Sequence, residues 1–516
     1  MLTAALGALA ATASVLAQAP DGATGTVPER PDLGPAAAPP DGAPPGLATI
    51  DRNDLRRHAY WLADDARDGR FTASKGQRAA AAYVAEHFQR LGLAPLGDKR
   101  GFLQQYPLDE LALAKGNGLV FGKHDMHDGF AVLHASDKDK VTLRGRFAWC
   151  GNGAADGLPA LKGRIPVVLL SGADRGGVGG DLQAVQRYVA IAKNLEKAGA
   201  AAGVVCLTDD HGSLANTLNY RALLPDHSRL SLDGPERPLV AVPLLVLNGA
   251  HSRVLCEHLG VAIGDGAASA TAADDKASGK LTIQLDKPRK TFGSNVVAVL
   301  EGTDRKSEAI VFSAHHDHVG TRLDGDRFNG ADDNASGTAG LLEIAAAFAT
   351  ASQRPERSIV FLSVSGEELG LWGSQWYADH PTWPLAKIVA DINIDMIGRA
   401  GRQDGKIAMQ VTPSHQHEKY STLVKDGVAL ADRFGIAFTS GDTYYARSDH
   451  YNFAKQGVPV VFFCDGEHPD YHQVTDTPDR LDYDAMEAIA RLAYWTGWRA
   501  AQAKGRPTEL GTQPSW

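Results

Sequence analysis

Histidines and acidic residues that could bind metal ions occur at five places in the second half of this chain, each at the end of an apolar run or in a glycine-rich turn. They are, in chain order, His315, Asp333, the pair Glu367 and Glu368, Asp395, and His472. Imidazole and carboxylate groups are the usual ligands of zinc in enzymes. Five such ligands, with one carboxylate shared by two ions and a spare glutamate, predict a metallohydrolase that uses two zinc ions.

The first histidine follows an apolar strand predicted over residues 309–314 and opens the sequence His315-His316-Asp317-His318. Residues two apart in an extended segment point to the same side, so Asp317 can accept a hydrogen bond from the far imidazole nitrogen of His315. We therefore predict that His315 binds metal and that Asp317 orients it. The roles of the three histidines could be exchanged, and we expect His316 and His318 to face solvent.

The first carboxylate ligand lies in residues 330–337, which read Gly-Ala-Asp-Asp-Asn-Ala-Ser-Gly and form a turn into a helix. An ordinary helix cap is the simpler interpretation of an isolated Asp-Asp-Asn. Its position shortly after His-x-Asp favours metal binding instead. One of its carboxylates, predicted to be Asp333, can bridge two ions that lie roughly 3.5 to 4 Å apart.

Two further apolar strands, predicted over residues 358–364 and 388–394, also end in carboxylates. Adjacent residues that leave a strand point in opposite directions, so one glutamate of a pair can bind metal while the other faces the reacting water. We predict Glu368 as the ligand and Glu367 as the general base. Asp395 follows the second strand, where a purely structural carboxylate would need hydrogen-bond donors of its own.

The total charge supports these residues as a set. His472 considered alone could be an ordinary hydrogen-bonded loop residue. Two zinc ions bring about +4, however, and Asp333, Glu368 and Asp395 with one bound hydroxide bring about -4, so the complete site is nearly neutral. Without metal, the clustered carboxylates would repel one another and would be costly to bury.

The remaining sequence predicts the elements that position these groups. From about residue 281 onward, strands alternate with helices, which is typical of an α/β sandwich with a mostly parallel sheet. Sites in such sheets form where loops leave the carboxyl ends of the strands. Residues 122–275 consist of short β-rich runs without any cluster of catalytic spacing, and we interpret them as an inserted non-catalytic module.

Composition indicates a globular protein of two or three domains, since 516 residues are 44% hydrophobic. The net charge of -9 favours neither a nucleic acid nor an anionic membrane as partner.

Residues 1–17 predict a signal peptide that ends in Val-x-Ala, and hence export to the periplasm or the medium. Because no basic residue precedes this stretch, a structural helix is the alternative. No later apolar run could span a membrane. Residues 18–46 predict a disordered leader, and residues 506–516 a C-terminal tail.

Together these motifs resemble the signatures of the co-catalytic dizinc aminopeptidases, which are relatives of glutamate carboxypeptidase. The similar strings are His-x-Asp, Gly-Ala-x-Asp-Asn-Ala-Ser-Gly, Gly-Glu-Glu-x-Gly, Asn-x-Asp-Met-Ile-Gly at 393–398, and Tyr-His-x-x-x-Asp-Thr at 471–477. The resemblance implies a three-layer α/β/α zinc exopeptidase fold over residues 47–121 and 276–505. It also implies that residues 122–275 are a protease-associated domain.

The same resemblance implies two zinc sites that share a bridging Asp333. His315 and Asp395 would hold one zinc, and Glu368 and His472 the other. The implied reaction is hydrolysis of the N-terminal peptide bond of peptide substrates by a zinc-bridging hydroxide.

Two further residues would assist that reaction. Glu367 would act as its general base, and Tyr471 would hydrogen-bond the tetrahedral oxyanion. A carboxypeptidase or dipeptidase on the same metals is the main alternative. A glutaminyl cyclase is expected to need a single zinc, and a receptor-like binding protein is expected to have lost ligands; neither expectation matches this sequence.

Overall fold

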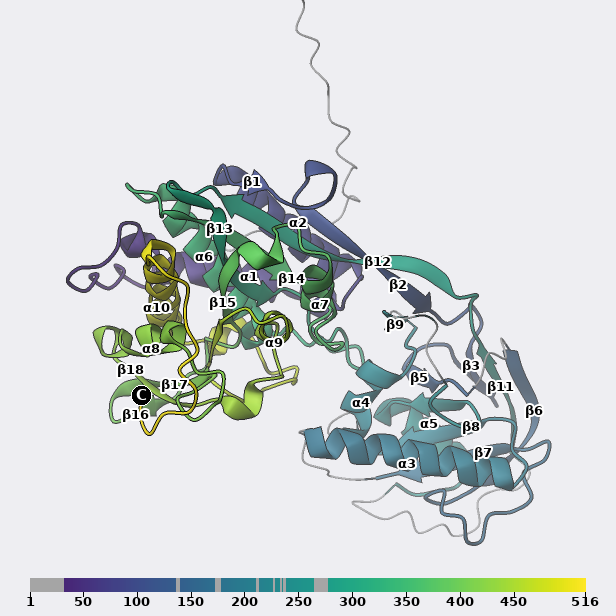
Figure 1. Cartoon of the computed structure of the whole chain (residues 1–516). Coiled ribbons are helices and arrows are strands. Elements are labelled where there is room, and N and C mark those ends of the chain that lie inside the picture. Colours follow the sequence, from purple (N-terminus) through teal and green to yellow (C-terminus); the bar gives the residue numbers. More distant parts are fainter. Residues whose placement is uncertain are drawn as a thin grey trace, which may run out of the picture.

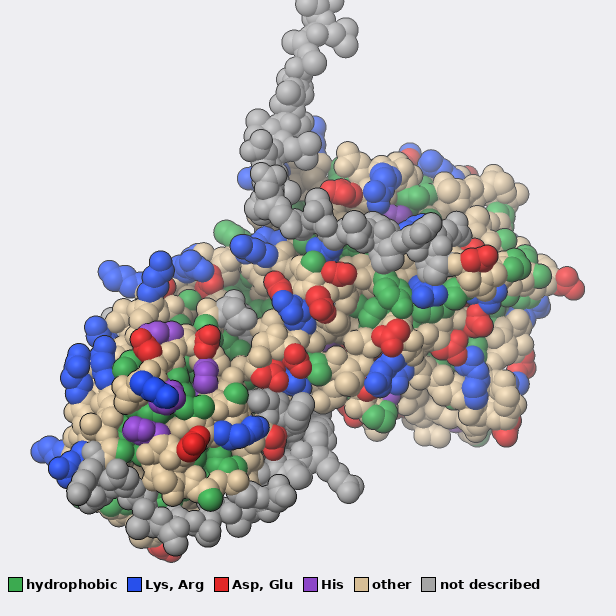
Figure 2. Space-filling view, turned by 180° about the vertical axis from the view of Figure 1, so that it is seen from behind, with side chains coloured by type: hydrophobic (Ala, Val, Ile, Leu, Met, Phe, Trp, Pro, Cys, Tyr) green, Lys and Arg blue, Asp and Glu red, His purple; other side chains and the backbone are tan. Residues whose placement is uncertain are grey.

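The computed structural model describes residues 32–135, 140–171, 178–209, 213–225, 228–232, 234, 238–263 and 277–516. The chain forms two domains, each built on its own sheet (Figure 1). The part of the chain from strand β3 to strand β11 is called the second domain, and the remainder is called the first domain. Seen from behind, the two lobes meet at a narrower waist (Figure 2). The signal peptide predicted over residues 1–17 lies outside the described residues.

The sheet of the first domain is mixed and has a parallel centre, which confirms the predicted α/β class. Its strand order is β16-β17-β19-β15-β13-β14-β12-β2-β9, with β1 beside β12 and β18 beside β17. The four neighbours β19, β15, β13 and β14 run parallel, and the strands that flank them on both sides pair with them antiparallel. The strands are β1 (Ala94–Pro95), β2 (Leu103–Leu111), β9 (Arg229–Ser231), β12 (Arg289–Leu300), β13 (Arg305–His315), β14 (Arg357–Val364), β15 (Ile388–Ile394), β16 (Arg402–Gln403), β17 (Lys406–Thr412), β18 (Ile436–Ser440) and β19 (Val460–Cys464).

Helices cover both faces of this sheet, so its central strands are apolar along their length. Along β13, Ile310 and Phe312 pack against one layer, whereas Ala309 and Val311 pack against the other. The first layer comprises α1 (Arg52–Leu62), α2 (Lys75–Arg90), α6 (Gly337–Thr350), α8 (Thr422–Val428) and α10 (Tyr483–Gln502). The second layer comprises α7 (Trp372–Asp379) and α9 (His450–Lys455). The result is a three-layer sandwich around the site.

The second domain has an eight-stranded sheet in the order β4-β3-β11-β6-β7-β8-β10-β5. Apolar clusters cover both of its faces, one beneath α3 and α4 and one beneath α5. Its elements are β3 (Gly118–Phe121), β4 (His124–Met126), β5 (Phe130–Leu133), β6 (Lys140–Trp149), β7 (Ile165–Leu170), α3 (Val178–Lys197), β8 (Gly203–Leu207), α4 (Ser213–Arg221), β10 (Leu244–Leu247), α5 (Gly249–His258) and β11 (Ser278–Gln284).

The two domains are joined by more than their connecting chains. Strand β9 lies within the sequence of the second domain but pairs antiparallel with β2 of the first sheet. Leu323 of the first domain is in turn buried in the apolar cluster beneath α3 and α4. These contacts fix the second domain beside the loop that follows His318.

The segment before α1 differs from the expected leader. Residues 33–46 were expected to be disordered, yet the backbone N–H of Ala37 donates to Glu487 at 2.9 Å, and Arg491 donates to the carbonyl of Ala37 at 2.8 Å. The hydroxyl of Tyr494 also donates to the carbonyl of Pro45. These three partners lie on α10. Composition alone could not reveal a segment held by polar groups of a distant helix.

Among the described residues, no helix is long and apolar enough to cross a membrane. The four cysteines Cys150, Cys206, Cys256 and Cys464 are all buried free thiols.

Glu343 gives the first domain a pH-dependent stability. Its carboxylate is buried in α6, 3.4 Å from His58 Nε2. Burial raises the pKa of Glu343 to about 8, whereas burial lowers the pKa of His58 to about 3. The pKa of Glu343 in the folded protein lies above its ordinary value. The contribution of this side chain to the free energy of unfolding is therefore fully present below about pH 4.5, and it is lost as the pH rises to about 8.

Glu343→Gln is therefore expected to raise the free energy of unfolding at pH 8.5 by a few kcal/mol and to change it little at pH 4.5. Urea denaturation at the two pH values measures the difference. Exposed Glu86→Gln on α2 serves as the control and should have little effect at either pH. An equal effect of Glu343→Gln at both pH values would contradict this account.

Candidate metal centre

The predicted ligands converge at the carboxyl ends of the central parallel strands. Strand β13 ends at His315, β14 leads into Glu367 and Glu368, and β15 ends one residue before Asp395. These strands are neighbours in the sheet, so their ends meet at one edge. The short helix η4 (Ala331–Ser336) and the loop after β19 complete the site with the remaining two ligands, Asp333 and His472.

Asp333 lies between two groups of ligand atoms. Its Oδ1 is 3.2 Å from His315 Nε2, which is also 3.2 Å from Asp395 Oδ1. Its Oδ2 is 2.9 Å from His472 Nε2, which is 3.1 Å from Glu368 Oε2. Two ligand atoms on a tetrahedral zinc with bonds of ~2.0–2.2 Å lie about 3.3 to 3.6 Å apart. Asp333 thus offers one oxygen to each of two groups that fit a metal ion.

The charges of the site favour cations. Burial lowers the pKa of His315, but the carboxylates of Asp395 and Glu367 outweigh burial and hold this pKa well above its usual value. Burial likewise opposes protonation of His472, yet Glu368 and Asp333 raise its pKa to about 10. The carboxylates therefore attract positive charge at both imidazoles. Metal ions can supply this positive charge in place of the imidazole protons.

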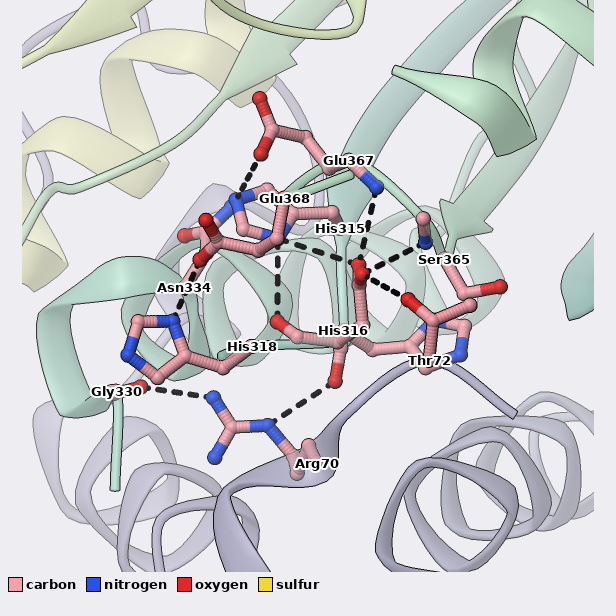
Figure 3. A network of polar contacts seen from close by, with 12 residues as sticks. Arg70, Thr72, His315, His316, His318, Gly330, Asn334, Ser365, Glu367 and Glu368 are labelled. Atoms are coloured by element: carbon pink, nitrogen blue, oxygen red, sulfur yellow. Dashed lines mark hydrogen bonds and ion pairs between the residues drawn. The ribbon is translucent and has the colours of Figure 1, made fainter. Parts of the chain in front are cut away.

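Glu367 and Glu368 face different parts of the site. Glu368 contacts His472 and His318, whereas the carboxylate of Glu367 lies toward His315 (Figure 3). Glu367 Oε2 is 3.9 Å from His315 Nε2. Burial holds the pKa of Glu367 well above its ordinary range. Glu367 also lines a small cavity of about 40 Å³ together with Asp395 and other residues.

Asp317 anchors two loops of the site. Its Oδ2 accepts hydrogen bonds from the backbone N–H of Gly366 at 2.7 Å and from the hydroxyl of Thr72 at 2.6 Å. His315 Nδ1 lies 3.3 Å from the backbone oxygen of Asp317 and 3.6 Å from its Oδ1. Asp317 therefore orients His315 mainly through its carbonyl, while its carboxylate holds the turn that carries Glu367.

The expectation that His316 and His318 face solvent is wrong, because both are buried. The N-terminal segment covers them: Phe71 forms a β-bridge with His318, whose backbone N–H donates to the carbonyl of Arg70 at 3.1 Å. This segment is about 245 positions distant in the sequence, so the pattern around His315 could not indicate it.

The two buried histidines have different partners. His316 Nε2 lies 2.8 Å from the side-chain nitrogen of Gln77, and its Nδ1 lies 2.9 Å from the hydroxyl of Ser363, so it points away from the ligands. His318 Nδ1 lies 2.6 Å from Glu368 Oε1. His318 is thus a contact of a predicted ligand that sequence reasoning missed.

Three more residues hold the ligands in place. Buried Arg70 donates to the carbonyls of His316 at 3.0 Å and Gly330 at 2.9 Å, and so links two ligand loops (Figure 3). Ser448 donates to Asp395 Oδ2 at 2.7 Å. Asp476 accepts from the backbone N–H of Asp333 at 3.2 Å, and burial raises the pKa of Asp476 to about 6. Asp476 belongs to the motif at 471–477, whereas Ser448 lies outside the motifs described above; the partners of both residues were not predicted.

Tyr471 and Arg447 line the small cavity beside Glu367. The ring of Tyr471 stacks on His472 with ring centroids 3.9 Å apart. Arg447 forms an ion pair with Glu467 at 2.7 Å, so its charge is already offset within the cavity wall.

Comparisons with known proteins point to one family. Residues 295–496 match Peptidase family M28. A probable zinc metalloprotease of Pyricularia oryzae is 30% identical over 253 residues, which cover 41% of this chain and 50% of that protein. The aminopeptidase YwaD of Bacillus subtilis is 23% identical over 243 residues, which cover 45% of this chain and 50% of that protein. The chain thus spans about half the length of these curated relatives.

Solved structures extend the likeness to the whole fold. The structure of BSAP, a zinc aminopeptidase from Bacillus subtilis, aligns with a TM-score of 0.58 and 18% identity, covering 90% of this chain and 98% of that one. An aminopeptidase from an Aneurinibacillus strain aligns with a TM-score of 0.51 and 20% identity, covering 91% of this chain and 97% of that one. At these identities the likeness shows a shared fold.

Proposed function

We propose that this protein is a zinc-dependent exopeptidase of peptidase family M28, whose model matches residues 295–496, and that it releases residues from the N-terminus of peptides. The observation that carries the proposal is the position of Asp333, whose two oxygens each join one group of ligand atoms. Curated relatives named as a zinc metalloprotease and an aminopeptidase support it.

Two zinc ions fit the chemistry of these donors. One would be held by His315, Asp395 and Asp333, and the other by His472, Glu368 and Asp333. Bound zinc supplies an acidified water as nucleophile and polarises the scissile carbonyl.

The protein's own side chains supply the proton transfers. Glu367 takes a proton from the attacking water and passes it to the leaving amine. Burial holds the pKa of Glu367 well above its ordinary range, which suits a group that must both accept and donate. Tyr471 lines the same cavity, and its hydroxyl can donate to the oxyanion that develops on the carbonyl.

The cavity beside Glu367 favours the N-terminal end of a peptide. Asp395 lines it and can attract an α-ammonium group. Arg447 would be the natural partner of an α-carboxylate, but it is paired with Glu467. These contacts favour an aminopeptidase over a carboxypeptidase or a dipeptidase.

We further propose that the protein is exported to the periplasm or the medium, on the basis of the signal pattern in residues 1–17. The second domain is proposed to be a protease-associated domain, with boundaries near residues 122 and 275. Sequencing of the secreted protein's N-terminus should show that processing occurs after residue 17.

Product analysis tests the proposed activity. The zinc-loaded protein is incubated with matched peptides whose N-terminus is either free or acetylated, and the products are identified by mass spectrometry. Loss of single residues from the free N-terminus alone is expected. Trimming of the acetylated peptide from its other end would replace the proposal with a carboxypeptidase. Cleavage of neither peptide would contradict a peptidase.

A further inference from the structure

A tyrosine of the second domain contacts one of the metal ligands. Tyr220 lies near the end of α4, and its hydroxyl is 2.7 Å from His472 Nδ1. The other ring nitrogen of His472, Nε2, is the atom that faces Asp333 and Glu368. The second domain therefore reaches the metal centre through a hydrogen bond to the outer nitrogen of a ligand.

This hydrogen bond is compatible with the tautomer of His472 that leaves Nε2 available to a metal. A neutral imidazole carries one proton, and a metal binds the nitrogen that lacks it. When His472 Nδ1–H donates to the hydroxyl oxygen of Tyr220, Nε2 is left free for the ion. The opposite tautomer would place the proton on Nε2 and would exclude a metal ion there.

The other histidine ligand does not depend on the second domain. His315 Nδ1 lies 3.3 Å from the backbone oxygen of Asp317, a residue of the first domain. His472 moreover has a φ of 52°, in the left-handed region that a non-glycine residue adopts at a cost. Its position therefore depends on the contacts that its side chain makes.

Helix α4 is held firmly enough to place Tyr220. The hydroxyl of Tyr188 on α3 donates to the carbonyl of Leu214 at 2.8 Å. Directly after α4, the backbone of Leu223 exchanges two hydrogen bonds with Val132, at 2.8 and 2.9 Å. Leu323 of the first domain packs in the same apolar cluster as α4. The helix is therefore fixed to its own sheet and against the first domain.

We propose that Tyr220 is a positioning residue for His472, so that the second domain helps to hold the zinc ion bound by Glu368 and His472. This inference rests on the proposed zinc sites and adds a role for the second domain, which the sequence indicated to be non-catalytic. Loss of such an outer contact weakens metal binding ~10–100-fold in zinc enzymes. We expect a loss of that size at one of the two sites.

Tyr220→Phe in the full-length protein tests the inference, because it removes the hydroxyl and keeps the ring. Competition with a zinc chelator should show one ion bound ~10–100-fold more weakly and the other unchanged. Tyr494→Phe removes a hydroxyl that donates to the carbonyl of Pro45 in the first domain and contacts neither His472 nor α4, and it should bind both ions like the wild type. In a His472→Ala background, Tyr220→Phe should cause no further loss.

Wild-type affinity for both ions in Tyr220→Phe would overturn the inference, and so would an equal loss in Tyr494→Phe. A wild-type protein that binds no zinc would instead overturn the proposed function. If Tyr220→Phe does not fold, ¹⁵N NMR of the zinc-loaded wild type decides the point. His472 is expected to carry a slowly exchanging proton on Nδ1; a proton that exchanges freely with solvent would contradict the role of Tyr220.

Discussion

Glu367→Gln is expected to lower kcat by ~10²–10⁴-fold while the protein keeps two zinc ions. The amide cannot accept the proton of the attacking water, but it preserves the shape of the side chain. Peptide hydrolysis and zinc content are measured on the same preparation. Exposed Glu301→Gln is the matched control and should retain wild-type activity.

Two outcomes would contradict the assignment of Glu367 as the general base. Wild-type rates with full zinc would show that another group accepts the proton. Loss of one zinc ion would make Glu367 a ligand. That alternative has a geometric basis, because a carboxylate oxygen of Glu367 lies close enough to His315 and Asp395 to share an ion with them.

Asp333→Ala is expected to remove both zinc ions together and to reduce peptide hydrolysis to background. Its two carboxylate oxygens face different ligand groups, so the substitution removes a ligand from each site. His315→Ala and His472→Ala form the comparison, since each should weaken mainly one ion. Metal analysis after gel filtration measures the number bound. An Asp333→Ala variant that retains one tightly bound zinc would contradict a bridging role.

The sequence located the centre of the fold well because its ligands follow apolar strands directly. The strands expected over residues 358–364 and 388–394 correspond to β14 (Arg357–Val364) and β15 (Ile388–Ile394). Adjacent parallel strands end at one edge, so residues just beyond them had to converge.

Features that depend on distant contacts could not be predicted in this way. Tyr220 and His472 are 252 positions apart, and no pattern near either residue indicates their contact. The role of His318 likewise became evident only from its position beside Glu368.

The central claim is that two zinc ions share the carboxylate of Asp333. Anomalous diffraction at the zinc edge, from a crystal of the zinc-loaded protein, tests it directly. We predict two peaks, one beside His315 and Asp395 and the other beside Glu368 and His472, with Asp333 between them. A single peak, or peaks that Asp333 does not join, would contradict the account.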